Sequence, residues 1–186
     1  STLMPTIAPP HWDLSNVYPA LDSPEFEAAR KDLNAQLDGL DAFFAEKVAT
    51  TNASTSVESL SQIAKELIDR FNKSNDLAET MGAYIYSFIT TDSFNQLAKR
   101  MLSQFEQVEM RLNMLAIQGK QWIGSVSAKL PEIIKASDTT KEHSFFLQET
   151  AEQSRYLMSE AEELLAAELG LSGASGWDKL QGTVTS

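Results

Sequence analysis

Two long stretches in the middle of the chain carry apolar residues at alternating spacings of three and four. The first stretch runs from Val57 to Phe88, and Ser74 is the only polar member of its stripe. The full stripe comprises Val57, Leu60, Ala64, Leu67, Phe71, Ser74, Ala78, Met81, Ile85 and Phe88. Such spacing places one apolar face along a helix, so we expect a helix from about Ser56 to Thr90. At 1.5 Å per residue, that helix would be roughly 50 Å long.

The second stretch repeats the spacing after a short break. Its stripe comprises Phe94, Leu97, Met101, Phe105, Val108, Leu112 and Leu115. Asp92 or Ser93 is expected to start this helix, because short polar side chains cap helix N-termini. Two long amphipathic helices joined by a short break favour an antiparallel hairpin, here from about Ser56 to Gln118. The residues expected to face inward are Leu67, Phe71, Met81, Ile85, Met101, Phe105 and Val108. A coiled-coil surface for a partner is the alternative explanation of these stripes.

An extended arm is expected over residues 1–22, since four of the six prolines lie within the first 20 residues. Proline lacks an amide donor and restricts the residue before it, which disfavours a helix. The arm also carries Trp12, Leu14, Val17 and Tyr18, so we expect it to dock onto another surface.

The first helix is expected to begin at Ser23-Pro24, a capping residue followed by the proline that suits the first helical position. One face carries Phe26, Leu33, Leu37, Leu40 and Phe44, and the helix should end near Glu46. Lys47 to Ser56 is predicted to form a loop. Thr55-Ser56-Val57-Glu58 then fits a capping box for the following helix.

The C-terminal third has a weaker pattern, with Gly119, Gly124 and Pro131 interrupting it. Trp122, Ile123 and Val126 suggest a short helix or a continuation of the preceding one. A further helix is expected from about Thr140 to Arg155, and it includes Phe145, Phe146 and Leu147. Ser159-Glu160-Ala161-Glu162 fits a second capping box, opening a short helix that Gly170 ends. Another short helix is expected near 174–181.

No segment shows convincing strand alternation, so the expected fold class is all-α. We expect a helical lobe over 23–186, built around the long antiparallel hairpin, with the extended arm before it and short C-terminal helices after it. A length of 186 residues fits one domain or one lobe of a larger protein.

The charge of the chain restricts its partners. It has 15 Lys and Arg against 26 Asp and Glu, a formal net charge of -11. That charge disfavours nucleic acid and anionic membrane surfaces, both of which attract clustered basic residues. No apolar run is long enough to span a bilayer and no secretory signal is visible, so a cytoplasmic location is expected. With no cysteine, the chain can form no disulfide.

No catalytic, cofactor-binding or metal-binding residue is predicted in this chain. The acidic pairs are Glu106/Glu109, Glu149/Glu152 and Glu162/Glu163, and they are interpreted as solvated faces or as charges favouring the helix dipole. A di-iron bundle would need Glu-x-x-His on two helices, but Thr140 precedes His143 by three and Ala8 precedes His11 by three. His143 is predicted to be structural. Phosphate-loop and nucleophile motifs are also absent.

Two groups of segments carry a family resemblance. Near the start, Trp12-Asp13-Leu14-Ser15-Asn16-Val17-Tyr18-Pro19-Ala20-Leu21 is followed by Ser23-Pro24-Glu25-Phe26. Near the end, Tyr156-Leu157-Met158-Ser159-Glu160-Ala161-Glu162-Glu163 precedes Gly173-Ala174-Ser175-Gly176-Trp177 and Val184-Thr185-Ser186. This order resembles the N-terminal region of oligoendopeptidase F, a zinc peptidase of the thimet-oligopeptidase-like group.

The resemblance implies a parent enzyme that hydrolyses short peptides with zinc. Such enzymes need a His-Glu-x-x-His helix, and neither of the two histidines here is followed by Glu. The N-terminal helices of the family form one wall of the substrate channel. The implied partners are therefore a C-terminal catalytic domain outside this chain and short peptide substrates. The alternative is a standalone helical interaction module without enzymatic activity.

A lobe that evolved to pack on another part of an enzyme should expose aromatic residues. The candidates are Trp12, Tyr18, Phe145, Phe146 and Trp177. We expect either an exposed apolar patch or its burial in a homodimer. The alternative is that these side chains complete a compact core of their own.

Overall fold

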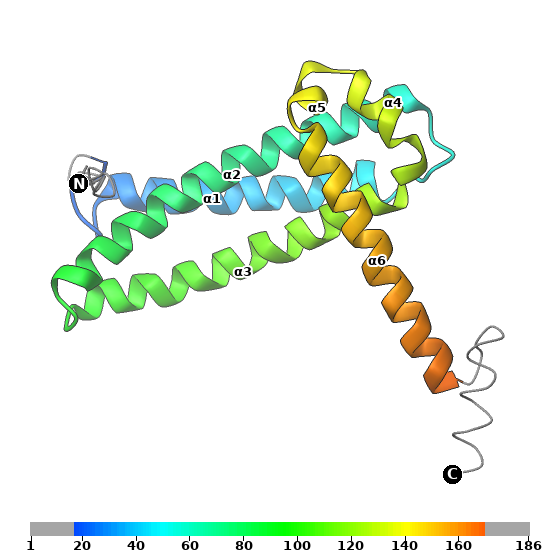
Figure 1. Ribbon diagram of the computed structural model, residues 1–186. Coiled ribbons are helices and arrows are strands. Elements are labelled where there is room, and N and C mark those ends of the chain that lie inside the picture. The colour runs from blue at the N-terminus through cyan, green and yellow to red at the C-terminus, as the bar shows by residue number, and fades with distance from the viewer. Residues whose placement is uncertain (1–16, 170–186) are drawn as a thin grey trace, which may run out of the picture. The chain divides into compact units, whose positions relative to one another are not determined.

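The computed structural model describes residues 17–169, and this part of the chain is helical with no strand. The all-α prediction is therefore confirmed. Its elements within the described range are α1 (Pro24–Phe43), a π-helical turn η2 (Phe44–Val48), α2 (Val57–Thr91), α3 (Gln96–Ser125), a 3-10 turn η3 (Ser127–Lys129), α4 (Leu130–Lys135), α5 (Asp138–Glu142) and α6 (Ser144–Leu169) (Figure 1). The short helix expected near 174–181 lies outside the described residues.

The chain divides into two compact units. The first comprises Ser1–Phe43 and Asp69–Leu115, and the second comprises Phe44–Ile68 and Ala116–Ser186. Helices α2 and α3 each contribute one part to each unit. The predicted division into an arm over 1–22 and a lobe over 23–186 stays a prediction.

The predicted start of α1 is confirmed in atomic detail. The Ser23 hydroxyl accepts a hydrogen bond from the Phe26 amide at 3.2 Å and donates one to the Ala20 carbonyl at 2.6 Å. Pro24 occupies the first helical position, where its missing amide costs nothing. The buried face of α1 comprises Phe26, Leu33, Leu37, Leu40 and Phe43. Phe44 is also buried, at the start of the π-helical turn.

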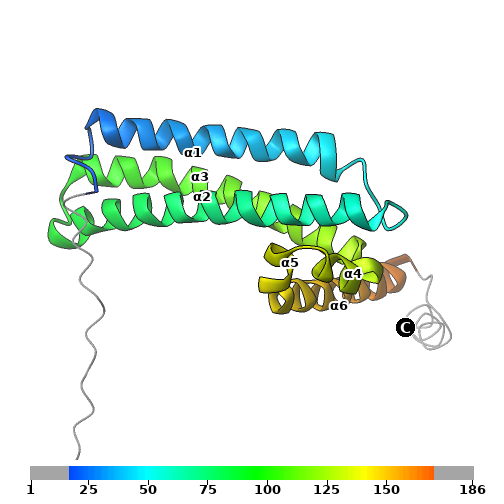
Figure 2. The same cartoon turned by 90° about the horizontal axis from the view of Figure 1, so that it is seen from above.

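In the described part of the first unit, segments of α1, α2 and α3 lie side by side (Figure 2). Side-chain contacts join each pair of these segments. Buried Ser74 on α2 donates a hydrogen bond to Gln36 Oε1 on α1 at 3.0 Å. That bond explains how the one polar residue of the α2 stripe is accommodated, because a buried hydroxyl needs a partner. Gly82 on α2 lies against the Phe105 ring on α3, since a Cβ added to this glycine would meet Phe105 Cε1 at 2.9 Å.

The stripes of α2 and α3 are largely buried as expected. Of the residues predicted to face inward, Leu67, Met81, Ile85 and Phe105 are buried. The others, Phe71, Met101 and Val108, are half-buried. The full antiparallel hairpin from Ser56 to Gln118 stays a prediction.

The cap of helix α2 lies one residue later than predicted. Ser56, and not Thr55, is the capping residue, because its hydroxyl accepts a hydrogen bond from the Ser59 amide at 3.3 Å. Glu58 therefore falls one position short of closing the predicted capping box. The predicted helix bounds of Ser56 to Thr90 still agree closely with Val57–Thr91.

The predicted start of α3 at Asp92 or Ser93 is wrong. Asp92 instead forms a turn, in which its carboxylate accepts a hydrogen bond from the Phe94 amide at 3.0 Å. Asn95 caps the helix by accepting from the Ala98 amide, also at 3.0 Å. Phe94 therefore precedes the helix and is 83% exposed, so its predicted place on the buried stripe is wrong as well.

The second unit is tied together by hydrogen bonds between distant segments. Trp122 Nε1 donates to Thr51 Oγ1 at 3.0 Å, and the Lys129 ammonium donates to the Thr55 carbonyl. These bonds fix the 49–56 turn to the end of α3 and to η3. Buried Thr140 donates to the Ile134 carbonyl at 2.9 Å, which connects α5 to α4.

Helix α6 packs on the last turns of α3 through a close approach at Gly124. A Cβ added there would lie 2.5 Å from Ser154 Cβ, so only glycine leaves room for this contact. The Ser154 hydroxyl also donates to the Lys120 carbonyl at 3.1 Å. Leu147 and Ala151 are buried on the same side of α6.

The predicted end of this helix near Arg155 and its restart at Ser159 are wrong. Helix α6 continues without a break through Ser159–Glu162 to Leu169. A capping sequence inside a helix has no free amides to satisfy, so the pattern alone does not create a boundary. Gly170, the predicted stop of this helix, lies outside the described residues.

Candidate functional site

The acidic pairs considered as metal ligands lie on exposed helix faces. Glu106 and Glu109 are exposed on α3, and Glu149 and Glu152 are exposed on α6. The side chains of Glu162 and Glu163 lie outside the described residues. Within the part of the chain that the structure describes, no three His, Cys, Asp or Glu side chains gather in a group that could hold a metal ion.

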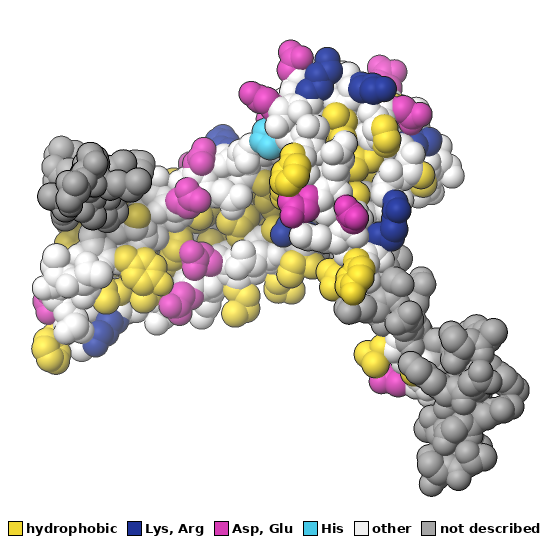
Figure 3. Space-filling view, in the orientation of Figure 1, with side chains coloured by type: hydrophobic (Ala, Val, Ile, Leu, Met, Phe, Trp, Pro, Cys, Tyr) yellow, Lys and Arg dark blue, Asp and Glu magenta, His cyan; other side chains and the backbone are white. Residues whose placement is uncertain are grey.

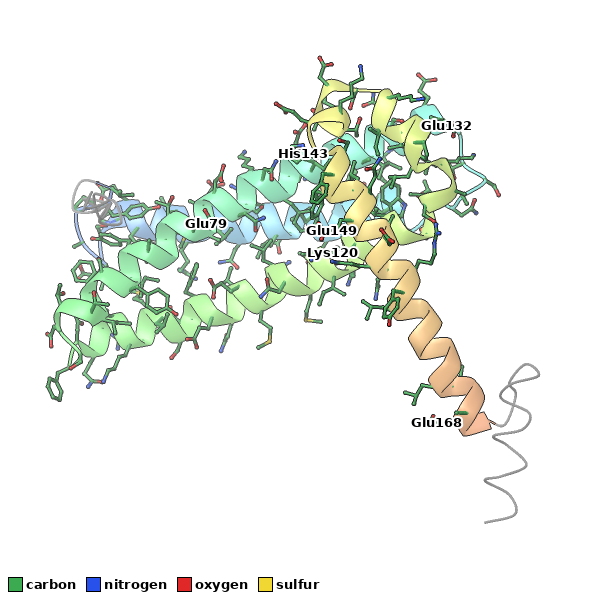
Figure 4. The ribbon with its side chains drawn as sticks, viewed as in Figure 1. Glu79, Lys120, Glu132, His143, Glu149 and Glu168 are labelled. Carbon is green, nitrogen blue, oxygen red and sulfur yellow. The ribbon has the colours of Figure 1, made fainter. Side chains whose placement is uncertain are left out.

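His143 has a structural role at the junction of α5 and α6 (Figure 4). Its Nδ1 lies 2.9 Å from the Thr139 carbonyl, and its backbone amide donates to the last carbonyls of α5. A histidine at this position satisfies carbonyls that the helix end leaves unpaired. His11 lies outside the described residues.

A polar groove crosses the surface of the first unit between α1 and α3. Its lining residues are Glu27, Arg30, Asn34, Gln104, Gln107, Val108 and Arg111. Within the groove, Arg30 Nε donates to Glu27 Oε2 at 2.9 Å, and this hydrogen bond lowers the pKa of the Glu27 carboxyl. The groove therefore presents charged and amide groups together.

Arg111 joins α3 to α1 at one end of this groove. Its Nη2 donates to Asp38 Oδ1 at 2.6 Å and also to Asp41 Oδ2. These hydrogen bonds, led by the one to Asp41, raise the pKa of the Arg111 guanidinium. The sequence stripes did not predict this contact, because all three residues lie outside the apolar faces.

Most of the large apolar side chains that are exposed in the described part of the second unit lie on α6. They are Phe145 (76% exposed), Phe146 (45%), Tyr156 (69%), Leu157 (63%), Leu164 (64%) and Leu165 (54%). Hydrophobic and acidic side chains lie side by side on the visible surface of this helix (Figure 3). The expected exposure of Phe145 and Phe146 is therefore observed.

Tyr18 differs from that expectation. It is 9% exposed, and its ring packs edge-on against Phe26 and Tyr84 with centroid distances of 5.1 Å in both cases. The end of the arm docks onto its own chain because these aromatic surfaces remove each other from water. Trp12 and Trp177, the remaining candidates, lie outside the described residues.

The exposed apolar side chains of α6 follow from its periodicity. Leu147, Ala151 and Ser154 lie on one side of α6, which includes the contact of Ser154 with Gly124 of α3, and the same three-four spacing reaches Leu165 eleven residues after Ser154. By the same geometry Phe145 and Tyr156 lie on the opposite side, and Leu157, three residues after Ser154, lies between the two sides. The sequence shows more apolar residues near Phe145 than one helix face requires, but it did not predict that α6 continues beyond Arg155.

Part of the chain matches a known protein family. Residues 127–186 match a family model of the peptidase M3 N-terminal region. That family is described as oligopeptidase F, and the match, over about a third of the chain, supports the predicted resemblance to an N-terminal region of oligoendopeptidase F. The matched part contains α4, α5 and α6 together with the C-terminal segments that carry the resemblance. No curated protein and no solved structure gives a significant match to the chain.

The family match supports the prediction that these residues belong to an N-terminal domain of a peptidase. Within residues 17–169, no helix is both long and apolar enough to cross a membrane. Zinc dependence, the cytoplasmic location and the partners stay predictions.

Proposed function

We propose that this chain is the N-terminal helical domain of a zinc-dependent oligoendopeptidase that hydrolyses short peptides. The observation that carries the proposal is the oligopeptidase F match over residues 127–186. In the parent enzyme, zinc would polarise the scissile carbonyl and activate water. The zinc-binding His-Glu-x-x-His motif does not occur in these 186 residues, so the reaction is assigned to another part of the parent protein.

The role proposed for this chain is one wall of the substrate channel. The polar groove of the first unit supports that role, because Asn34, Gln104 and Gln107 can both donate to and accept from a peptide backbone. The Arg111 contact with Asp38 and Asp41 would hold the two sides of the groove at a fixed separation.

A negative charge introduced into the groove tests this role in the complete parent protein. Gln107→Glu should raise the KM for a quenched fluorescent peptide more than it lowers kcat, because it alters substrate binding and leaves the zinc centre untouched. Gln62→Glu, the same change at an exposed position of α2 outside the groove, is the matched control. Equal KM values for Gln107→Glu and Gln62→Glu would contradict the channel-wall assignment.

The second candidate function is a helical interaction module. The exposed apolar face of α6 favours it, because monomeric proteins rarely expose a large contiguous apolar patch without a binding role. A natural chain end at Ser186, followed by no His-Glu-x-x-His sequence in the gene, would favour this module over the peptidase domain.

A further inference from the structure

We propose that the outer face of α6 docks a polypeptide segment in which Lys or Arg side chains lie beside apolar ones. This inference stands independently of the peptidase proposal, since it concerns binding and requires neither zinc nor hydrolysis. It commits to a basic, partly apolar partner segment as the occupant of this face.

Tyr156 and Leu157 supply the apolar part of the proposed docking surface. They are 69% and 63% exposed; Tyr156 lies on the side of α6 opposite the contact with α3, and Leu157 lies on the flank next to it. Together with Glu149, Glu152 and Gln153 they line a shallow depression on the helix surface. Apolar side chains of a partner can remove this surface from water, which is the main source of favourable binding free energy.

Glu149 and Glu152 supply the charged part of the same surface. Glu149 and Glu152 lie one helical turn apart, and neither carboxylate makes an ion pair or a side-chain hydrogen bond with any residue in the described range. Both are exposed beside the apolar pair, and Figure 4 shows Glu149 on α6. A Lys or Arg of the partner would therefore meet carboxylates that no described basic group already neutralises.

The charge of the whole helix separates this occupant from the alternatives. The sequence of α6 contains six glutamates and one arginine, within a chain of net charge -11. A second copy of the chain would bring like charges together along this face, which is unfavourable. Nucleic acid and anionic lipid would be repelled for the same reason. A basic segment is the complementary partner.

Fluorescence anisotropy with the 186-residue chain tests the proposal. The probe is a fluorescein-labelled amphipathic peptide of leucine and lysine, compared with a peptide in which glutamate replaces every lysine. We expect saturable binding of the lysine peptide, about tenfold or more tighter than that of the glutamate peptide at low salt. Added salt should weaken the binding, because the carboxylates are exposed.

Two paired variants locate the site. Glu149→Gln with Glu152→Gln should weaken binding about tenfold, and so should Tyr156→Ala with Leu157→Ala. All four side chains are exposed, so circular dichroism should show an unchanged fold. The matched control is Glu106→Gln with Glu109→Gln, which removes the same charge from α3 and should change the affinity by less than about twofold.

Two results would overturn the proposal. Equal losses in the α3 control and the α6 charge variant would show that net charge attracts the peptide without a site. A concentration-dependent dimer in sedimentation, abolished by Tyr156→Ala with Leu157→Ala, would show that a second copy occupies the face.

Discussion

The Tyr84 hydroxyl on α2 donates a hydrogen bond to the backbone carbonyl of Tyr18, at 3.1 Å. The two rings also pack edge-on, and the Phe88 ring lies 5.0 Å from that of Tyr84. Tyr18 precedes α1 by six residues, so this contact fixes the entry of the chain into the first unit. The docking surface that the arm needs is therefore supplied, at least for Tyr18, by the chain itself.

Tyr84→Phe should lower the free energy of unfolding by about 1–2 kcal/mol, because it leaves the buried Tyr18 carbonyl without its donor. Urea denaturation followed by circular dichroism measures this. Tyr86→Phe is the control. Tyr86 is 47% exposed, so the loss of its hydroxyl should change the free energy of unfolding by less than about 0.5 kcal/mol. Equal stability of Tyr84→Phe and the parent chain would contradict the structural role of this bond.

The same pair predicts a loss of stability at high pH. Burial, and secondarily Asp32, raises the pKa of Tyr18, and burial, with Asp22, raises the pKa of Tyr84. Above about pH 10, tyrosines of the unfolded chain release protons before these two do, so the free energy of unfolding falls as pH rises. Below pH 10 this contribution is fully present.

Equilibrium unfolding at several pH values from 8 to 11 checks that prediction. Replacing Tyr18 and Tyr84 together with phenylalanine should flatten the pH dependence. Replacing the exposed Tyr86 and Tyr156 should leave it unchanged. The opposite pattern would show that the buried pair is not the source.

Gly82→Ala should destabilise the first unit by about 1–3 kcal/mol through overpacking against Phe105. Alanine favours helices by up to about 1 kcal/mol, so the sign of the net change tests whether the contact is tight. Gly39→Ala is the matched control, because the added methyl meets only the end of the flexible Arg70 side chain. A melting temperature of Gly82→Ala equal to or higher than that of Gly39→Ala would contradict the close packing of α2 on α3.

Phe105→Ala should cost about 3–5 kcal/mol, because the ring is only 4% exposed in the core of the first unit. Phe94→Ala should cost less than about 0.5 kcal/mol, since Phe94 is 83% exposed before the start of α3. Phe71, which is half-buried, should fall between them. Similar losses of stability for Phe94→Ala and Phe105→Ala would contradict the exposed position of Phe94 and support its predicted place on the buried face.

The sequence predicted the long helices well because their stripes are nearly complete. The bounds of α2 differ from the prediction by one residue at each end, and Phe26, Leu33 and Leu40 are buried as expected. Local polar chemistry was harder to predict. Asp92, Ser93 and Asn95 are all good capping residues, so residue type alone does not show that Asn95 caps α3.

The candidate surface on α6 was only partly visible in the sequence. Phe145 and Phe146 were expected to be exposed, and they are. The predicted break at Ser159 divided α6 into two short helices, which hid the fact that Tyr156 and Leu164 belong to one continuous helix. The contacts of Arg111 with Asp38 and Asp41 depend on two helices distant in sequence, so no periodicity could reveal them.

Hydrolysis of a quenched fluorescent oligopeptide by the complete parent protein is the most direct test of the proposed function. We expect turnover that a chelator abolishes and zinc restores, while the 186-residue chain alone shows no turnover and no stoichiometric zinc binding. Chelator-sensitive turnover by the 186-residue chain alone would contradict the account, and so would a complete protein that cleaves no short peptide with zinc present.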